Sequence, residues 1–393
     1  MRKPPIRTLT LGLAEPHPLA FSAIERAAHI LQQASQRYID AGYEVQTLRI
    51  STRPVFDDLA NASASDLVRY AQEVQRMLDD VGLEFCSCGT AKAASPQFSL
   101  ERIESIADML EATTALNATV LLATGKDGIR YEAARHAARV MQRLARETAE
   151  GFGNFRFAVL ARVDPGCPFF PSAYHSGPAS LSIGLQGAGI VADALRPHTS
   201  GGAHPLDLEQ VRQWIANALV EQAASIVELG KGLAQKHNLV FGGIDLSPAP
   251  LGEESIVSAM ELCGYGKVGE TGTVAVASAI TGALKSTSLP TCGYCGLMLP
   301  VLEDAVLGHR WEEGLVNTHS LLLYSTVCGT GLDTIPLPGD IEESAIAHLL
   351  LDVATMALRL NKPLSARLFP VPGKRPGERT TFTSPYLTNT LVR

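Results

Sequence analysis

Short apolar segments alternate with longer amphipathic segments through the first half of the chain. The apolar segments predict β-strands at 6–13, 43–50, 82–86, 118–123 and 155–161. The amphipathic segments, in which apolar residues recur every three or four positions, predict helices at 21–41, 65–81, 99–114 and 131–150. Strands that are apolar on both faces and separated by helices predict an α/β fold with a mainly parallel sheet covered on both sides.

The same pattern continues with less regularity in the second half. Further strands are predicted at 181–185, 239–244 and 363–371, and further helices at 206–235, 274–284 and 341–360. The apolar run 318–327 is interpreted as strand-like. The segment that follows it, 328–340 (CGTGLDTIPLPGD), contains three glycines and two prolines, which predict a rigid irregular loop.

Composition and charge narrow the class of protein. The chain has 393 residues, of which 46% are hydrophobic and 19% charged, with a net charge of −7. We interpret 1–393 as one domain with a polar tail at about 380–393, which is a candidate arm for a homo-oligomer. Mild acidity without a basic cluster argues against nucleic acid as a partner. The sequence shows neither a long apolar span nor a signal peptide, so no membrane partner and a cytoplasmic location are expected.

Cysteine usage does not indicate a disulfide framework. The chain has seven cysteines, an odd number. Cys292 and Cys295 form a C-x-x-C pair, which is a candidate for metal binding or redox chemistry. The alternative is that both are small buried thiols, which is the common role of free cysteine.

Two acidic residues occupy similar places in their own structural units. Asp245 follows the strand predicted at 239–244, and Asp333 lies in the loop 328–340. If the sheet closes, both could point into one mouth and hold Mg²⁺ or Ca²⁺, or act as acid and base. The alternative is that each only binds neighbouring backbone N–H groups, as aspartate often does in loops.

The segment 164–177, rich in proline, glycine and aromatic residues, follows the strand predicted at 155–161. By analogy with eight-stranded α/β barrels, the loops after parallel strands are where active sites form. Tyr174 and His175 are therefore candidates for a hydrogen-bond donor and a proton shuttle. A rigid aromatic plug with a satisfied histidine is the alternative.

The glycine-rich segment 264–273 precedes a predicted helix, so its N–H groups suit an anionic group such as a carboxylate or phosphate. Gly269 and Thr271 are the candidate ligands there, and Glu270 is a candidate base. The segment matches neither dinucleotide nor P-loop spacing, so no nucleotide cofactor is expected. Close helix packing through glycine is the alternative.

Two cations near the end of the chain are candidates to hold an anion. Arg367 lies within the last predicted strand, and Lys374 follows that strand. Arg367 has an alternative role as a buried ion-pair partner, because it lies between Ala366 and Leu368.

Several long motifs carry a family resemblance. They are 168–175 (PFFPSAYH), 296–304 (GLMLPVLED), 328–340 and 367–374 (RLFPVPGK). With them the chain, from about residue 6 to 382, resembles a bacterial and archaeal family called domain of unknown function 711. The resemblance implies a ten-stranded α/β barrel of the type found in pyruvate formate-lyase and ribonucleotide reductase.

The resemblance also bears on Cys328. The related radical enzymes place a cysteine on a loop through the barrel, and Cys328 is the candidate for that position. They also need a glycine in a C-terminal Arg-Val-x-Gly-Tyr-like motif, whereas this chain has no glycine after Gly377. We therefore expect no radical cofactor, and Cys328 would act only as a polar nucleophile or pack.

These observations lead to two functional hypotheses. The first is a non-radical enzyme of lyase or hydrolase type that acts on a small anionic, amino-acid-like metabolite in the barrel mouth, with a divalent metal or with acid–base chemistry. The second is a non-catalytic protein that binds or sequesters the same kind of small molecule.

Overall fold

The computed structural model describes residues 3–199 and 204–393, in which ten strands form one mixed sheet. The predicted α/β fold with ten strands is confirmed. The strands are β1 (Ile6–Gly12), β2 (Leu48–Ser51), β3 (Phe85–Ala91), β4 (Leu116–Thr124), β5 (Gly128–Ile129), β6 (Phe157–Ala161), β7 (Ser180–Leu185), β8 (Val240–Asp245), β9 (Gly331–Pro338) and β10 (Leu364–Val371).

Strand directions divide the sheet into a centre and two flanks. The order is β8-β7-β1-β2-β3-β4-β6-β10-β9, and β5 pairs only with β4. Strands β1, β2, β3, β4 and β6 are parallel neighbours. Strand β7 runs antiparallel to β1, and β10 runs antiparallel to β6. The flanking pairs β7–β8 and β9–β10 therefore run opposite to the central strands.

An irregular segment links the two edges of this sheet. The N–H of Cys292 donates to the carbonyl of Ile244 on β8 at 3.1 Å, and the N–H of Val301 donates to the carbonyl of Asp333 on β9 at 3.1 Å. Isolated bridges join the same two places, Ile244 to Thr291 and Asp333 to Pro300. The segment 291–301 thus occupies the gap between β8 and β9.

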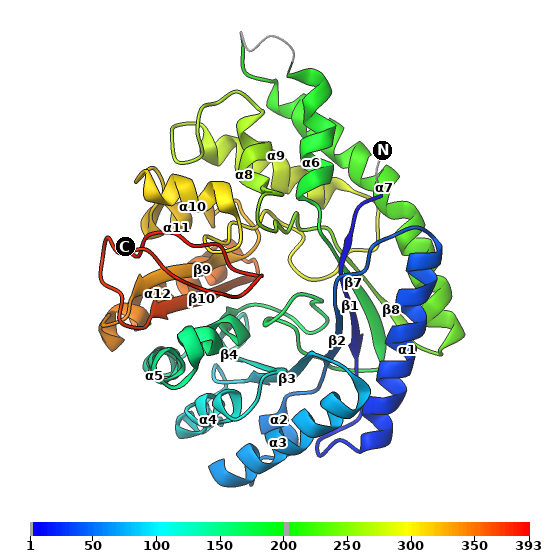
Figure 1. Ribbon diagram of the computed structural model, residues 1–393, viewed down its shortest axis with the longest axis vertical. Coiled ribbons are helices and arrows are strands. Elements are labelled where there is room, and N and C mark those ends of the chain that lie inside the picture. The colour runs from blue at the N-terminus through cyan, green and yellow to red at the C-terminus, as the bar shows by residue number, and fades with distance from the viewer. Residues whose placement is uncertain (1–2, 200–203) are drawn as a thin grey trace.

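The helices lie on the outside of the strands (Figure 1). None of the helices in the described part of the chain is long and apolar enough to cross a membrane. They are α1 (Phe21–Asp40), α2 (Val55–Asp58), α3 (Ala64–Val81), α4 (Ser105–Glu111), α5 (Tyr131–Glu147), α6 (Ala188–Leu195), α7 (Leu208–Lys236), α8 (Ile256–Glu261), α9 (Thr273–Ser286), α10 (Ala305–Glu312), α11 (Thr318–Tyr324) and α12 (Glu343–Leu360). The longer predicted helices, such as α1, α3 and α5, bury an apolar stripe, as the periodicity predicted.

Two predictions about the segment before β10 are wrong. The run 318–327, interpreted as strand-like, begins with helix α11, and the predicted loop 328–340 contains strand β9. Its prolines are tolerated because β9 is an edge strand, which pairs along its length only with β10 and meets the segment 291–301 only at Asp333. Gly331 has φ +90°, and a Cβ there would lie 2.3 Å from the carbonyl oxygen of Ser365. That glycine permits pairing with β10 rather than preventing it.

The C-terminal segment 380–393, predicted to be a polar tail, packs back on the domain. Phe382, Leu387 and Val392 are buried and form an apolar cluster with Leu302 and Phe369. The segment is therefore part of the fold.

The segment between β6 and β7 runs through the inside of the curved sheet. The hydroxyl of Thr10 on β1 donates to the carbonyl of Pro168 at 2.9 Å, and that of Ser87 on β3 donates to the carbonyl of Ala173 at 2.5 Å. Both contacts are buried. This interior segment, 162–179, supplies one wall of a small polar pocket inside the sheet.

Candidate functional site

The central pocket lies between the interior segment and the strands. About 70 Å³ of it is open to the centres of water-sized molecules. That is room for about five waters, or for a metabolite of similar size. Its polar lining is unusually rich in charge for a buried site and comprises Arg7, Arg49, Asn117, Ser172, Tyr294, Glu303, Thr330, Asp333, Ser365, Arg367 and Tyr386.

The pocket lies toward the beginning of the central strands. Arg7 is the second residue of β1, Arg49 the second of β2, and Phe85 the first of β3. The site predicted by analogy lay at the opposite ends of these strands. The interior segment extends to the beginnings of the strands, where its residues Phe169, Phe170, Pro171 and Ser172 line the pocket.

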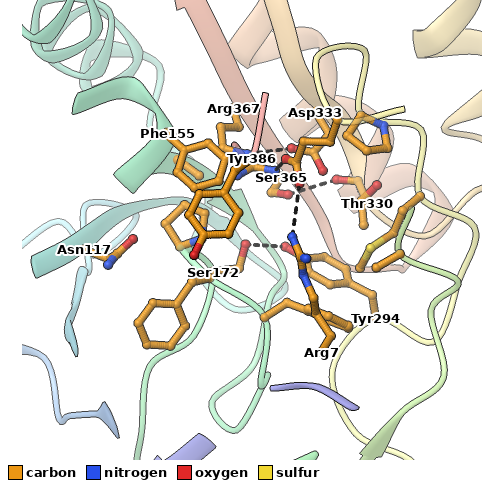
Figure 2. A pocket seen from close by; sticks show the side chains of 18 of the residues that line it. Arg7, Asn117, Phe155, Ser172, Tyr294, Thr330, Asp333, Ser365, Arg367 and Tyr386 are labelled. Carbon is orange, nitrogen blue, oxygen red and sulfur yellow. Dashed lines mark hydrogen bonds and ion pairs between the residues drawn. The ribbon is translucent and has the colours of Figure 1, made fainter. Parts of the chain in front are cut away.

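A buried ion-pair network forms the wall next to β9 and β10. Nε of Arg367 donates to Oδ1 of Asp333 at 2.7 Å, and its Nη2 donates to Oε1 of Glu303. Nη2 of Arg7 lies 3.9 Å from Oε2 of the same glutamate. Figure 2 shows Arg7, Asp333 and Arg367 converging on this wall, with Phe155 beside them. The Arg367 guanidinium also lies 4.9 Å from the centre of the Phe155 ring.

Burial and charge act against each other in this network. Burial, together with the charge of Asp333, raises the pKa of the Glu303 carboxyl, and the charges of Arg367 and Arg7 oppose that rise. Burial disfavours the charged form of Arg367, but the carboxylates of Asp333 and Glu303 raise its pKa above its ordinary value. Glu303 is thus a carboxyl whose proton affinity is increased, held beside permanent cations.

Arg49, on the wall formed by β2, is a cation of a different kind. Nε donates to the hydroxyl of Thr47 at 2.9 Å, and the guanidinium lies 5.0 Å from the ring centres of both Phe85 and Phe170. Within the described residues, no carboxylate lies within ion-pair distance of it. Burial, reinforced by the nearby charge of Arg7, lowers its pKa to about 9. Arg49 remains protonated at neutral pH without a counter-ion.

Hydroxyl groups complete the lining. The Tyr294 hydroxyl donates to Oγ of Ser172 at 2.8 Å, and the two side chains face each other in Figure 2. Oγ of Ser365 donates to the carbonyl of Thr330 at 2.9 Å. The hydroxyl oxygen of Thr330 is buried and has no hydrogen-bond partner in the described part of the chain. A polar ligand would find a donor and acceptor there.

The structure does not bring Asp245 and Asp333 into one site. The Asp245 carboxylate is fully buried outside the pocket lining and accepts hydrogen bonds from the N–H and hydroxyl of Ser247 and from the N–H groups of Tyr294 and Cys295. Asp245 therefore fixes the turn that presents Tyr294. Over residues 3–199 and 204–393, no three His, Cys, Asp or Glu side chains are grouped so that they could hold a metal ion.

The polar groups of Tyr174 and His175 make their hydrogen bonds away from the pocket. The Tyr174 hydroxyl donates to the carbonyl of Val163 at 2.8 Å. Nε2 of His175 lies 3.0 Å from the carbonyl oxygen of Pro178, and burial lowers the pKa of the ring. Neither side chain lines the pocket, so the geometry matches the aromatic-plug alternative.

Polar groups of the glycine-rich segment before α9 form hydrogen bonds within the segment and with the first residue of α9. The N–H of Gly269 donates to the hydroxyl of Thr273, and Oε2 of Glu270 accepts from the N–H of Lys267 at 2.8 Å. Thr271 is exposed. These residues lie outside the pocket lining, which is consistent with the alternative that the glycines serve helix packing.

The remaining candidates also lie outside the lining. Lys374 follows β10 and is half-buried. Burial raises the pKa of the Cys328 thiol to about 12, so this thiol is not an activated nucleophile. Burial also raises the pKa values of Cys292 and Cys295.

Sequence reasoning missed Arg7, Arg49, Glu303 and Tyr386. A signal for Arg49 was present, because Thr47, Arg49 and Ser51 alternate with apolar residues and all three are buried. Such an alternation inside a buried strand indicates a polar cavity on one face of the sheet. Glu303 carried no such signal, because it directly precedes Asp304, which caps α10, and paired acids at the start of a helix are common.

Comparisons with known proteins agree with the resemblance found in the sequence. The model of a family described as "Uncharacterised ACR (DUF711)" matches residues 1–383. A UPF0210 protein of Pyrobaculum arsenaticum is 28% identical over 95% of this chain and 86% of its own length, and one of Oenococcus oeni is 28% identical over 96% and 88%. The anaerobic ribonucleotide reductase from Thermotoga maritima aligns with a TM-score of 0.45 and 9% identity, over 92% of this chain and 75% of the reductase.

Proposed function

The chain belongs to the DUF711 family, and from the geometry of its central pocket we propose that it is an enzyme that binds a small carboxylate at Arg49 and transforms it by acid–base chemistry at Glu303. The observation that carries this proposal is the buried guanidinium of Arg49, which lies on a ligand-sized pocket without a carboxylate partner among the described residues. A buried charge without a partner is costly, and an anionic ligand removes that cost.

The balance of charge in the pocket favours an anion. Its lining contains three arginines and two carboxylates, so it carries an excess of one positive charge when all five groups are ionised. Asp333 and Glu303 are occupied by Arg367, which leaves Arg49 as the cation available for a ligand. A guanidinium binds a carboxylate with two parallel hydrogen bonds, which fixes the ligand's orientation.

The size and remaining polarity of the pocket limit the ligand further. A cavity volume of about 70 Å³ limits the ligand to a small metabolite. The hydroxyls of Thr330, Ser172 and Tyr294 offer hydrogen bonds to hydroxyl, amino or carbonyl groups on such a molecule. Small hydroxy, oxo and amino acids share these features.

Glu303 is suited to move a proton on the bound carboxylate. Its raised pKa makes it a stronger base when ionised, and Arg367 and Arg7 hold it in one orientation. Burial keeps the Tyr294 hydroxyl protonated by raising its pKa, and this hydroxyl donates to Oγ of Ser172, which leaves the Ser172 hydroxyl to donate a hydrogen bond to a developing negative charge. Proton removal next to a carboxylate followed by loss of a leaving group is a lyase step, and delivery of a proton to a leaving group serves hydrolysis.

Binding is tested with a panel of carboxylates of three to about six non-hydrogen atoms, by calorimetry and by thermal unfolding of the wild type, Arg49→Gln and Lys374→Gln. We expect Arg49→Gln to lose about 30-fold in affinity, about 2 kcal/mol, because a charge-assisted hydrogen-bond pair is lost. Lys374→Gln removes a cation outside the pocket and should bind as the wild type does. Equal affinity in all three proteins would rule out Arg49 as the anion site.

Turnover is tested separately with Glu303→Gln, which keeps the shape of the side chain. The carboxylates that bind are incubated with the protein in D₂O and followed by NMR. We expect the wild type to exchange the hydrogen next to the carboxylate or to form product, and Glu303→Gln to bind without doing either. A wild type that binds tightly yet leaves every ligand unchanged would favour the non-catalytic binding protein.

A further inference from the structure

Three aromatic side chains form a shared partition between the central pocket and a cavity on the outer surface. Phe85, Phe155 and Tyr386 line both spaces. The outer cavity lies over the beginnings of β3 and β4 and is also lined by Leu83, Thr114 and Phe152. These side chains are therefore the boundary that a ligand crosses if it enters from that cavity.

Tyr386 completes this partition through ring contacts. Its ring stacks on Phe155 with the centres 5.9 Å apart and 18° between the planes, and it meets Phe85 edge-on at 6.3 Å. The Arg7 guanidinium lies 6.0 Å from the centre of the same ring. Figure 2 shows Tyr386 between Phe155 and Ser172. Among the contacts described, the Tyr386 hydroxyl makes no hydrogen bond to the protein.

The chain around Tyr386 is anchored on both sides. Before it, Phe382 is buried, and its N–H donates to Oδ1 of Asn389 at 2.7 Å. After it, the N–H of Thr388 donates to the carbonyl of Leu302 at 2.6 Å, and Val392 is buried. These anchors do not involve the Tyr386 ring, so changing the ring should leave the segment attached.

We propose that Tyr386 is the specificity-determining residue of the central pocket, which restricts it to short carboxylates and slows their exchange with solvent. The proposal rests on the carboxylate-binding function proposed above. A short carboxylate fits behind the ring, whereas one with a bulky substituent needs the volume that the ring occupies. Because the ring is held by aromatic and cation–π contacts rather than by hydrogen bonds, it can move aside for a ligand to pass.

The test measures affinity and dissociation rate for two probes, glycolate and phenylacetate, in the wild type, Tyr386→Ala, Tyr386→Leu and Tyr386→Phe. We expect both truncations to bind phenylacetate about tenfold more tightly and to release glycolate about tenfold faster. Tyr386→Phe keeps the ring, so it should still exclude phenylacetate. Circular dichroism and thermal unfolding establish that each variant is folded. If Tyr386→Ala fails to fold, Tyr386→Leu still tests the proposal, because it keeps an apolar side chain at this position.

The outcomes separate this proposal from the function on which it rests. Arg49→Gln should lose both probes alike, whereas the Tyr386 truncations should change only the preference between them and the exchange rate. If the truncations leave both quantities unchanged while Arg49→Gln loses binding, the specificity role is refuted and the carboxylate site stands. If no protein binds either probe, both proposals fail.

Discussion

The two strand walls of the central pocket each present a buried arginine, but they use it differently. On β10, Arg367 is held by the carboxylates of Asp333 and Glu303. On β2, Arg49 has only a threonine hydroxyl and two aromatic rings. Both side chains are about equally buried, with 7% of each residue exposed. Burial alone therefore does not distinguish an arginine that builds the site from one that is available to a ligand, whereas its charge partners do.

The largest effect is expected from removing the arginine that has partners. Arg367→Met would leave the buried Glu303 and the partly buried Asp333 without the cation that both contact. We expect a loss of about 3–5 kcal/mol in the free energy of unfolding, because breaking a buried ion pair leaves uncompensated charge. Urea unfolding measures it, and a loss below about 1 kcal/mol would contradict the distinction between the two walls.

A change of pH should act on Arg49 alone of the two arginines. Its pKa is lowered to about 9, while that of Arg367 is raised. A carboxylate binds the protonated form, so affinity should be constant below about pH 9 and fall about tenfold for each pH unit above it. Calorimetry between pH 7 and about pH 10 measures the fall. A flat profile to pH 10 would mean that the pKa of Arg49 in the empty pocket is not lowered to about 9.

The same lowered pKa has the opposite effect on the empty protein. Between pH 9 and the ordinary pKa of arginine, the unfolded chain binds more protons at this position than the folded chain does. The contribution of Arg49 to stability therefore rises as pH rises through that window. The free energy of unfolding is measured against pH for the wild type and for Arg49→Met. The difference between the two profiles isolates the contribution of Arg49 from those of other groups that titrate in the same pH range.

At neutral pH, Arg49→Met should change stability little. The substitution removes a buried charge that has no carboxylate partner and places an apolar side chain between Phe85 and Phe170. We expect the free energy of unfolding to change by at most about 1 kcal/mol, in either direction. Urea unfolding of Arg49→Met and Arg367→Met compares the two losses in the free energy of unfolding directly. Equally large losses in both variants would contradict the distinction between the two arginines.

The sequence predicted the fold more completely than the site, for a physical reason. Strand and helix periodicity arises from burial of apolar residues and can be read locally, as the agreement at β1, α3 and β10 shows. The prediction failed at β9 because proline and glycine were judged without knowing that the strand lies at a sheet edge.

Arg367 shows why the site was harder. Its two roles, anion ligand and ion-pair partner, could not be separated until Asp333 and Glu303, 34 and 64 residues away, were placed beside it. In the sequence Arg49 resembles Arg367, because each is an arginine between two apolar residues. Loop residues such as His175 were candidates because loops carry sites in related architectures, but here all three arginines of the pocket lie on strands.

The smallest effect is expected at Glu270, which was predicted to be a base beside an anion. Its carboxylate is exposed and accepts a hydrogen bond from the N–H of Lys267, so it stabilises only its own turn. Glu270→Gln keeps an acceptor there, and we expect carboxylate affinity to be unchanged and the free energy of unfolding to fall by at most about 0.5 kcal/mol. A large loss of carboxylate binding in this variant would place the anion at the start of α9. Both strand walls would then be structural, and the difference between Arg49 and Arg367 would have no functional meaning.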